Sequence, residues 1–304
     1  MTIMISEKWP QLLEAGLRIV FEAQRDEIMR ESLIPSLFNV QSSNSAFEES
    51  ASVNGLRDWF EYKGAIEYAE PLEGWGARYE HTEYVQGMIV ERKLIDDSKY
   101  REINARTTML ATSAERTREK HGASVFNNAF SSAFTGGDGV ALCGAHPYSP
   151  SNATTQSNAG STALSHTSIA STLALMRAYK GGIGEHLTVQ PDMLVIPPAL
   201  ESAAYVALQT AGLPGSPNND INYLQSKSFT VVVWKYLEDT NNWFMIDSQL
   251  MKRWLNWFDR VPIEFSLDPR SDFELMLRFR GYMRYSYGWD DWRWIYGHEV
   301  AGGT

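Results

Sequence analysis

Apolar side chains recur at helical spacing across residues 96–134, the longest such pattern in the chain. They stand about three or four residues apart, or at multiples of these steps, and no proline interrupts them. The Asp-Asp-Ser run at 96–98 offers a side-chain cap and negative charge at one end, and the glycine pair at 136–137 suits a left-handed cap at the other. The pattern predicts one helix of roughly 58 Å, at ~1.5 Å per residue. Its apolar positions are Tyr100, Ile103, Leu110, Ala114, Val125, Ala129 and Phe130.

The middle of this predicted helix, residues 115–122, has no large apolar side chain. A segment of that composition is expected to face water or a charged partner rather than the core of its own chain. Gly122 leaves a second interpretation open, because glycine costs about 1 kcal/mol in a helix interior. On that interpretation two ordinary helices meet near residue 122.

Two later segments alternate between apolar and polar side chains, which is typical of half-buried strands. Residues 260–267 and 272–280, with a turn at 268–271, predict an antiparallel hairpin with one apolar face. That face needs cover, and the long helix is the expected cover. The apolar positions are Val261, Ile263, Phe265, Leu267, Phe273, Leu275, Leu277 and Phe279.

The N-terminal 38 residues show a helical pattern bracketed by Pro10 and Pro35, and residues 41–52 are polar and serine-rich. This predicts an arm tethered by a loop ahead of the main body; a helix packed on the first domain is an equal alternative. Residues 53–93 predict a two-stranded excursion, with strand composition over 79–90. Because isolated two-stranded ribbons are barely stable in water, this excursion needs a neighbour.

Residues 155–250 predict a compact α/β unit. Before it, residues 138–147 predict a turn, a short strand and a break, and 150–162 a surface loop or boundary. Ser165 is the expected cap of a helix that Gly181 and Gly182 stop. The remaining expected elements are a buried strand at 194–196, a helix at about 199–211, and strands at 229–234 and 243–246 joined by a turn at 239–242.

Composition restricts the class of protein. The chain has 304 residues, 43% of them hydrophobic and 21% charged, which is ordinary for a folded protein. Its single cysteine allows no internal disulfide, and no segment resembles a signal peptide or a membrane span, so we expect folding in a cytoplasm. A net charge of −10 argues against a protein whose task is to grip nucleic acid. Ten tryptophans favour extensive self-association, since aromatic residues are enriched at interfaces.

Candidate chemistry is sparse. Cys143 near Asp138 and His146 is the one group that could suggest nucleophilic catalysis, and we interpret it as structural because all three lie in one short segment. The paired carboxylates at 96–97 and 290–291 are interpreted as a cap and a turn. The glycine-rich run at 135–139 is not a phosphate-binding loop, because it lacks the Lys-Ser/Thr pair that follows the glycines in such loops. We therefore expect no catalytic residue, no cofactor and no metal site. The six histidines are scattered, at His81, His121, His146, His166, His186 and His298. Trp289, Trp292 and Trp294 could stack on sugars or bases, but we interpret them as interface or core.

Several short motifs, taken together and in order, resemble the major capsid protein of tailed bacteriophages with the Hong Kong 97-like fold, close to the head subunits of Mu-like phages. The similarity runs from about residue 84 to 297. The motifs are Glu91-Arg92 with Asp96-Asp97, Asp138-Gly139-Val140-Ala141-Leu142 with Ala145-His146-Pro147, Leu194-Val195-Ile196-Pro197-Pro198, Trp243-Phe244-Met245-Ile246-Asp247 and Asp291-Trp292-Arg293.

The resemblance implies an α+β fold with six segments. Residues 1–52 would be an N-terminal arm and 53–93 an extended β-hairpin loop. Residues 94–154 and 255–288 would form a peripheral domain, with a long spine helix on an antiparallel sheet. Residues 155–254 would be an axial α/β domain, and 289–304 a tail that returns to it. The loop would find its support on a neighbouring subunit, and the charged middle of the helix would face the shell interior or another chain.

The implied function is mechanical rather than enzymatic. Copies of the chain would assemble as hexamers and pentamers into an icosahedral head that encloses double-stranded DNA, inside a virion made in the host cytoplasm. Other expected partners are a separate scaffolding protein, since 50 residues before the loop leave no room for a built-in one, a portal and decoration proteins. The acidic balance would let packaged DNA slide along the wall, and no membrane is involved. An encapsulin-type nanocompartment is the main alternative; a carbohydrate-binding module and a cysteine hydrolase are the others.

Overall fold

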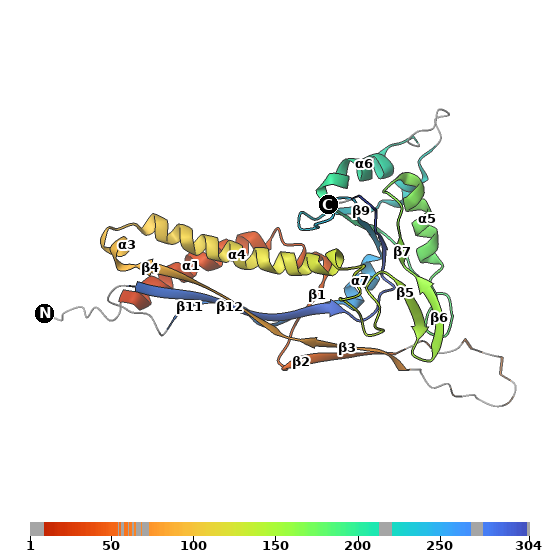
Figure 1. Ribbon diagram of the computed structural model, residues 1–304, viewed down its shortest axis with the longest axis horizontal. Coiled ribbons are helices and arrows are strands. Elements are labelled where there is room, and N and C mark those ends of the chain that lie inside the picture. Colours follow the sequence, from red (N-terminus) through yellow and green to blue (C-terminus); the bar gives the residue numbers. More distant parts are fainter. Residues whose placement is uncertain are drawn as a thin grey trace.

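A computed structural model describes residues 9–212, apart from several positions between 54 and 72, together with residues 221–268 and 276–302. The described chain combines helices with a four-stranded sheet, a five-stranded sheet and two two-stranded ribbons. Figure 1 shows an elongated body in which helix α4 (Tyr100–Asn127) runs beside long strands. A second unit of shorter elements surrounds β9 (Thr230–Val233), α5 (His166–Arg177) and α6 (Glu201–Gln209) in Figure 1. The α+β class expected from the sequence is confirmed.

The four-stranded sheet has the order β1-β11-β12-β4 and forms the long layer of the body. Its strands are β1 (Asn39–Ser42), β4 (Thr82–Glu91), β11 (Leu255–Leu267) and β12 (Met276–Trp289). β1 runs parallel to β11, and the other pairs are antiparallel. The predicted alternation holds, since Ile263, Phe265, Leu277 and Phe279 are buried. Both strands extend the predicted hairpin at the end away from its turn, and residues 269–275 lie outside the described chain.

Helix α4 (Tyr100–Asn127) lies along this sheet, but it is shorter than the predicted helix. The Asp-Asp-Ser run does not cap it: α3 (Arg92–Asp96) ends there, and Ser98 adopts a left-handed conformation with φ 55°. At the other end, the side chain of Asn128 donates to the carbonyl of Ser124, and that of Asn127 bonds the backbone of residues 236 and 238. Such polar side chains compete with helical hydrogen bonds, so the helix stops well before the glycine pair.

Gly122 lies inside α4, which continues through it, so the interpretation as two broken helices is wrong. A Cβ at this position would stand 3.2 Å from Trp234, 3.3 Å from Ile34 and 3.4 Å from Phe38. Ile34 begins the short helix α2 (Ile34–Leu37), and Trp234 follows a strand of the second unit. Glycine therefore allows two other segments to approach the helix closely.

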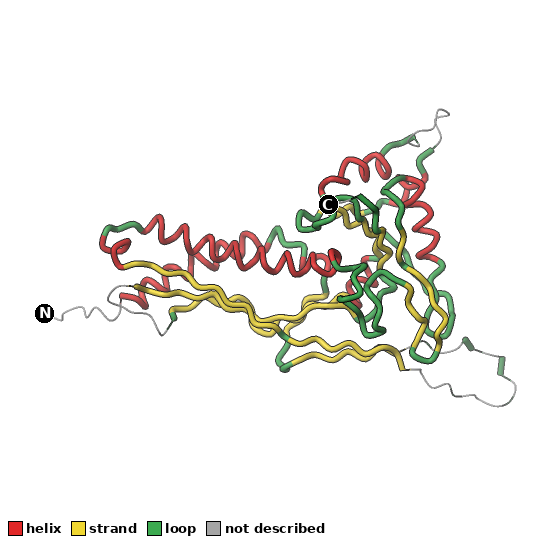
Figure 2. Tube along the Cα trace, in the orientation of Figure 1, coloured by secondary structure: helices red, strands yellow, loops and turns green. Residues whose placement is uncertain are grey.

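The N-terminal segment packs on its own chain. Helix α1 (Trp9–Met29) contacts α4 and β11, and Figure 2 shows these helices on one side of the long strands. Leu17 and Phe21 are buried, and the ring of Phe21 stacks on Phe265 with centroids 5.1 Å apart. Of the two alternatives for this segment, the structure therefore shows the packed helix.

The loop predicted for residues 41–52 is wrong, because most of this segment forms strands. β1 ends at Ser42, and β2 (Phe47–Val53) pairs antiparallel with β3 (Glu73–Glu80). Backbone pairing does not require apolar side chains, so a polar composition concealed both strands. The excursion therefore consists of β2 and β3, whereas β4, which we had assigned to it, belongs to the long sheet. Many positions between β2 and β3 lie outside the described residues.

The second unit is built on a five-stranded sheet with the order β7-β13-β10-β8-β9. Its strands are β7 (Ala159–Gly160), β8 (Met193–Ile196), β9 (Thr230–Val233), β10 (Trp243–Ile246) and β13 (Ile295–His298). Its helices are α5 (His166–Arg177) and α6 (Glu201–Gln209), with short 3-10 turns η2 (Pro198–Leu200) and η3 (Tyr223–Lys227). Helix α7 (Ser248–Trp254) instead contacts β1, β11 and α2. Ser165 caps α5 in a complete capping box, as predicted. The loop predicted at 150–162 is wrong, since β5 (Ala145–Ser149) and β6 (Asn152–Ser157) form a hairpin there.

Candidate functional site

The residues nearest to a catalytic arrangement, Asp138, Cys143 and His146, do not form one. Nδ1 of His146 lies 2.5 Å from a carboxylate oxygen of Asp138, and its ring stacks on Trp292 with centroids 4.4 Å apart. The other ring nitrogen faces the backbone carbonyl of Leu142. Cys143 is buried, and burial raises the pKa of its thiol well above the ordinary value. A nucleophilic cysteine needs a lowered pKa and a base within reach, so this group is structural.

The other chemical candidates also have structural roles. Trp289, Trp292 and Trp294 are all buried and offer no platform for a sugar or a base. Asp290 accepts hydrogen bonds from Tyr79 and Asn256, and Asp291 pairs with Arg293. Within the described residues, no group of three histidine, cysteine or acidic side chains could hold a metal ion. No helix in the same part of the chain is long and apolar enough to cross a membrane.

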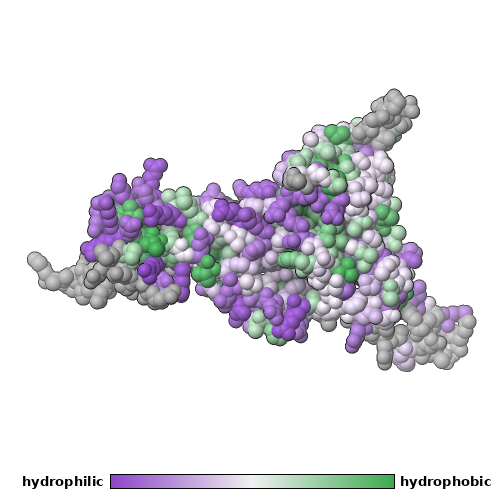
Figure 3. Space-filling view, viewed as in Figure 1, coloured by the Kyte–Doolittle hydropathy of each residue, from purple (hydrophilic) through white to green (hydrophobic). Residues whose placement is uncertain are grey.

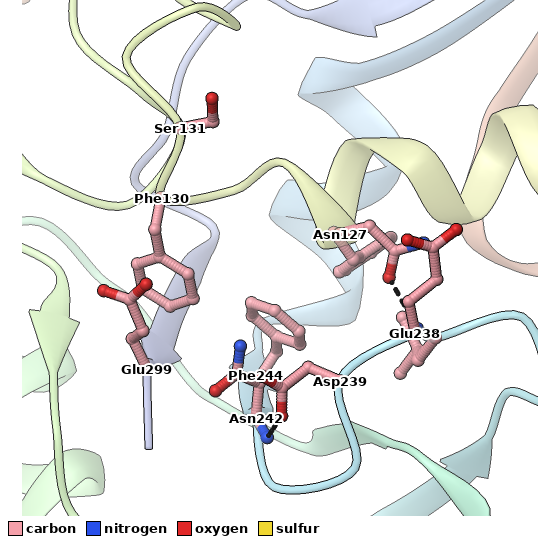
Figure 4. A pocket seen from close by; sticks show the side chains of 10 residues that line it. Asn127, Phe130, Ser131, Glu238, Asp239, Asn242, Phe244 and Glu299 are labelled. Atoms are coloured by element: carbon pink, nitrogen blue, oxygen red, sulfur yellow. Dashed lines mark hydrogen bonds between the residues drawn. The ribbon is translucent and has the colours of Figure 1, made fainter. Parts of the chain in front are cut away.

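A cavity of about 400 Å³ lies at the end of α4, beside the turn that precedes β10. Figure 4 shows Phe130 and Phe244 within it and the carboxylates of Glu238, Asp239 and Glu299 around it. The backbone N–H of Glu238 donates to Asn127, and Asp239 accepts from the backbone of the following turn. The lining includes no histidine or cysteine that could act with these carboxylates. The hydrogen bonds of Asn127, Glu238 and Asp239 stabilise the turn that precedes β10.

The charged middle of α4 contains the largest departure from the sequence expectation, because three of its five charged side chains are buried. Glu119 is 8% exposed and accepts three hydrogen bonds. The donors are the hydroxyl of Ser32 at 2.5 Å, the backbone N–H of Leu33 at 3.0 Å and the indole N–H of Trp234 at 2.9 Å. One side chain thus joins the α1–α2 connection, the long helix and the second unit.

A second buried ionic group lies on the same helix. The guanidinium of Arg118 forms two hydrogen bonds to the carboxylate of Asp259 on β11, at 3.0 and 3.2 Å. It also stands 5.2 Å from the ring centroid of Trp257, a distance that permits a cation–π contact. Glu115 is 2% exposed, and one of its carboxyl oxygens has no hydrogen-bond partner. Burial, the largest cause, raises its pKa.

The β2–β3 ribbon is fixed to the body at its base. The hydroxyl of Tyr79 donates to Asp290 at 2.5 Å, and its ring packs on Phe258 with centroids 5.3 Å apart. His81, which follows β3, lies 3.0 Å from the hydroxyls of both Ser43 and Ser286. These contacts orient the ribbon relative to β11 and β12. Sequence reasoning missed Tyr79 and His81, since neither stands in a recognisable motif.

Beyond its base, the excursion presents aromatic side chains to solvent. Trp59, Tyr62 and Tyr68, among the described positions between the two strands, are all exposed, Trp59 completely. Phe47 on β2 is also exposed. Large aromatic side chains gathered on one exposed segment are typical of protein interfaces. The geometry therefore favours contacts with another protein over chemistry.

The comparisons with known proteins agree with this interpretation. A family model described as phage capsid protein matches residues 77–297, whereas a search of curated proteins found no significant match. Among solved structures, a chain of Microbacterium phage Oxtober96 is similar with a TM-score of 0.57 and 8% identity, over 88% of this chain and 91% of that one. A chain of Mycobacterium phage Patience has a TM-score of 0.56 and 10% identity, over 99% and 89%. The encapsulin of Synechococcus elongatus has a TM-score of 0.54 and 10% identity, over 88% and 86%. These structural likenesses confirm the expected fold.

Proposed function

The chain belongs to the phage capsid protein family, and from this premise we propose how its parts build a shell. It is a major capsid protein of the Hong Kong 97-like fold, a structural component of the virion head rather than an enzyme. Copies of the chain assemble with one another into the icosahedral head. Which residues form each domain, how many subunits close into a ring and which other proteins take part are proposals.

We assign residues 94–154 and 255–288, which include α4, β11 and most of β12, to the peripheral domain, whose sheet β1 and β4 complete. Residues 155–254 form the axial domain, and the tail at 289–304 contributes β13 to its sheet. Residues 1–52, named as an arm from the sequence, include α1, which packs on α4. The extended loop comprises the β2–β3 ribbon and the residues between its strands. Support for this division comes from the two separate sheets.

The observation that carries the assembly proposal is the exposed aromatic surface of the extended loop. Trp59, Tyr62 and Tyr68 contribute large apolar areas that water solvates poorly. The ribbon is held at its base by Tyr79 and His81, so its two strands are oriented relative to the body. We propose that they bind a neighbouring subunit, and that subunits close into hexamers and pentamers.

We further propose that the head encloses double-stranded DNA, and that a separate scaffolding protein, a portal and decoration proteins take part in assembly. Support comes from family membership. Closeness to the Mu-like head subunits rests on the order of the sequence motifs. An encapsulin-type compartment is the second candidate, because an encapsulin shares the fold. The two candidates differ in what the shell contains.

Electron microscopy of the purified protein, expressed with its neighbouring genes, tests the proposal. We expect closed shells that contain DNA; a protein cargo instead would favour the encapsulin candidate. Trp59→Ser should leave the chain folded yet reduce shell formation strongly. Leu175→Ser, at an exposed position of α5, is the matched control and should assemble normally. Dispersed particles from the unaltered chain under all conditions would refute the proposal. Uniform shells from the chain expressed alone would exclude a required scaffold.

A further inference from the structure

The exposed side of α4 carries a basic stripe in an otherwise acidic chain. The stripe consists of Arg101, Ala105, Met109, Thr112, Arg116 and Lys120, which follow one another at steps of three or four residues and are all exposed. Lys99 and Arg106 flank it, and Glu102 is its one exposed carboxylate. The net charge of the whole chain is −10. This surface is therefore positively charged, whereas the whole protein has a negative net charge.

The surface is positive because α4 buries most of its acidic side chains and exposes most of its basic ones. The helix contains three acidic residues, and two of them, Glu115 and Glu119, are turned inward and buried. Arg116 and Lys120, their immediate neighbours in sequence, point to solvent. The stripe therefore presents these cations and almost no carboxylate. Figure 3 shows hydrophilic groups over this helix, interrupted by paler and more hydrophobic ones.

The cations of the stripe are not neutralised by neighbours. Within the described chain, neither Arg101, Arg116 nor Lys120 forms an ion pair. Arg116 also lines a groove of about 440 Å³ together with Lys235 of the second unit, and Glu31, Glu115 and Glu119 line the same groove, so the basic surface is confined to the helix. Cations without partners retain their counterions, and releasing these counterions favours binding of a polyanion.

We propose that this stripe contacts the phosphate backbone of the nucleic acid that the shell encloses. The proposal rests on the proposed function. From Arg101 to Lys120 the stripe spans roughly 28 Å at ~1.5 Å per residue, the length of about eight base pairs. The acidic remainder of the chain keeps this contact weak and reversible.

A second copy of the chain is the competing partner. The β2–β3 ribbon is acidic, with Glu48, Glu49, Glu73 and Glu80 against Arg78 alone. Arg78 already lies near Glu49 and Glu80, however, at 3.7 and 3.3 Å. Aromatic side chains, rather than carboxylates, dominate the exposed surface of that segment. The ribbon is therefore expected to make apolar contacts, and its acidic excess makes a second copy the outcome that the experiment separates from nucleic acid.

The test uses the unassembled full-length chain and a fluorescent 30-base-pair duplex of random sequence, with anisotropy recorded across a salt series. A stripe that neutralises three phosphates gives a slope of about −2.7 in log K against log salt, equivalent to a roughly 40-fold weakening from 50 to 200 mM. Combining Arg101→Gln, Arg116→Gln and Lys120→Gln should abolish most of this slope. Arg101→Lys with Arg116→Lys, which keeps the charges, should preserve it.

The matched control removes three exposed cations elsewhere, through Arg177→Gln, Lys227→Gln and Arg253→Gln. It changes the net charge equally and should leave the slope near that of the unaltered chain. Shell formation by every variant is scored separately by electron microscopy, so a failure of assembly is distinguishable from a failure of binding. An unchanged slope in the stripe variant would overturn the proposal. Loss of shells in that variant alone, with DNA binding retained, would also overturn it and assign the stripe to a second copy.

Discussion

The buried carboxylate of Glu119 offers the sharpest test of how the layers are joined. Its three donors come from the α1–α2 connection and from Trp234 of the second unit. Glu119→Ala removes all of these acceptors at once. Ser32 is only partly buried and its hydroxyl can turn to water, whereas the buried indole N–H of Trp234 and the partly buried backbone N–H of Leu33 lose their partner.

The expected cost follows from those two donors. An unsatisfied buried donor costs about 1–3 kcal/mol and a partly buried one less, so Glu119→Ala should lower the free energy of unfolding by roughly 3 kcal/mol. Glu119→Gln keeps the volume and one accepting oxygen, but its amide must face one of the donors. We therefore expect an intermediate loss of about 2 kcal/mol. Lys120→Ala, one residue further on and exposed, should change stability by less than about 0.5 kcal/mol.

Urea unfolding of the unassembled chain, followed by tryptophan fluorescence, measures these differences. Amide hydrogen exchange adds a local readout, because the N–H of Leu33 is one of the donors and should lose protection in Glu119→Ala. A Glu119→Ala variant within about 1 kcal/mol of the unaltered chain would refute the reasoning. Equal losses in the alanine and glutamine variants would likewise show that hydrogen-bond acceptance is not the cause.

Three further predictions concern the same core. Burial raises the pKa of Glu115, so the folded chain binds its proton more tightly than the unfolded chain; this contribution to stability is complete below pH 4.5 and is lost as pH rises through the folded pKa. Glu115→Gln should raise the urea midpoint at pH 7.5 and flatten its change between pH 4.5 and 7.5; an unaltered profile would contradict this. Gly122→Ala should destabilise by about 1 kcal/mol, because overpacking against Trp234 exceeds the gain in helix propensity, whereas Gly16→Ala in α1, with nothing within 4 Å, should stabilise by about 0.5–1 kcal/mol; calorimetry that gave both the same sign would exclude the packing argument. Cys143 should resist iodoacetamide in the folded chain and react once urea unfolds it, as mass spectrometry would show, and fast labelling of the native chain would contradict its burial.

Elements with local signals could be predicted from the sequence. The capping box at Ser165, the apolar strand at 194–196 and the alternation along β11 and β12 each depend on residues within one element. The interpretation of Cys143, Asp138 and His146 as structural also used a local signal, since residues so close together in sequence cannot be arranged freely. These predictions required no knowledge of distant contacts.

Elements fixed by distant partners could not be predicted in this way. The charges of residues 115–122 indicated a solvated segment, yet Glu119 and Arg118 find partners 86 to 141 residues away. The composition of a segment shows that burying its charges would be costly, but it does not show which distant residue will pair with them and offset that cost. The same limit applies to β1, whose polar residues pair with β11 across more than 200 positions.

The buried and exposed charges of α4 have connected roles. Arg118 is bound to Asp259 of the sheet and Glu119 to Trp234 of the second unit, so the helix is held on two sides. A rotation by one residue, about 100°, would break both contacts and turn other charges toward the core. The buried pairs therefore fix the direction in which Arg116 and Lys120 point. In a shell built from many copies, each copy must direct the same surface the same way. Ionic contacts that add little net stability can thus determine where every copy directs its basic stripe.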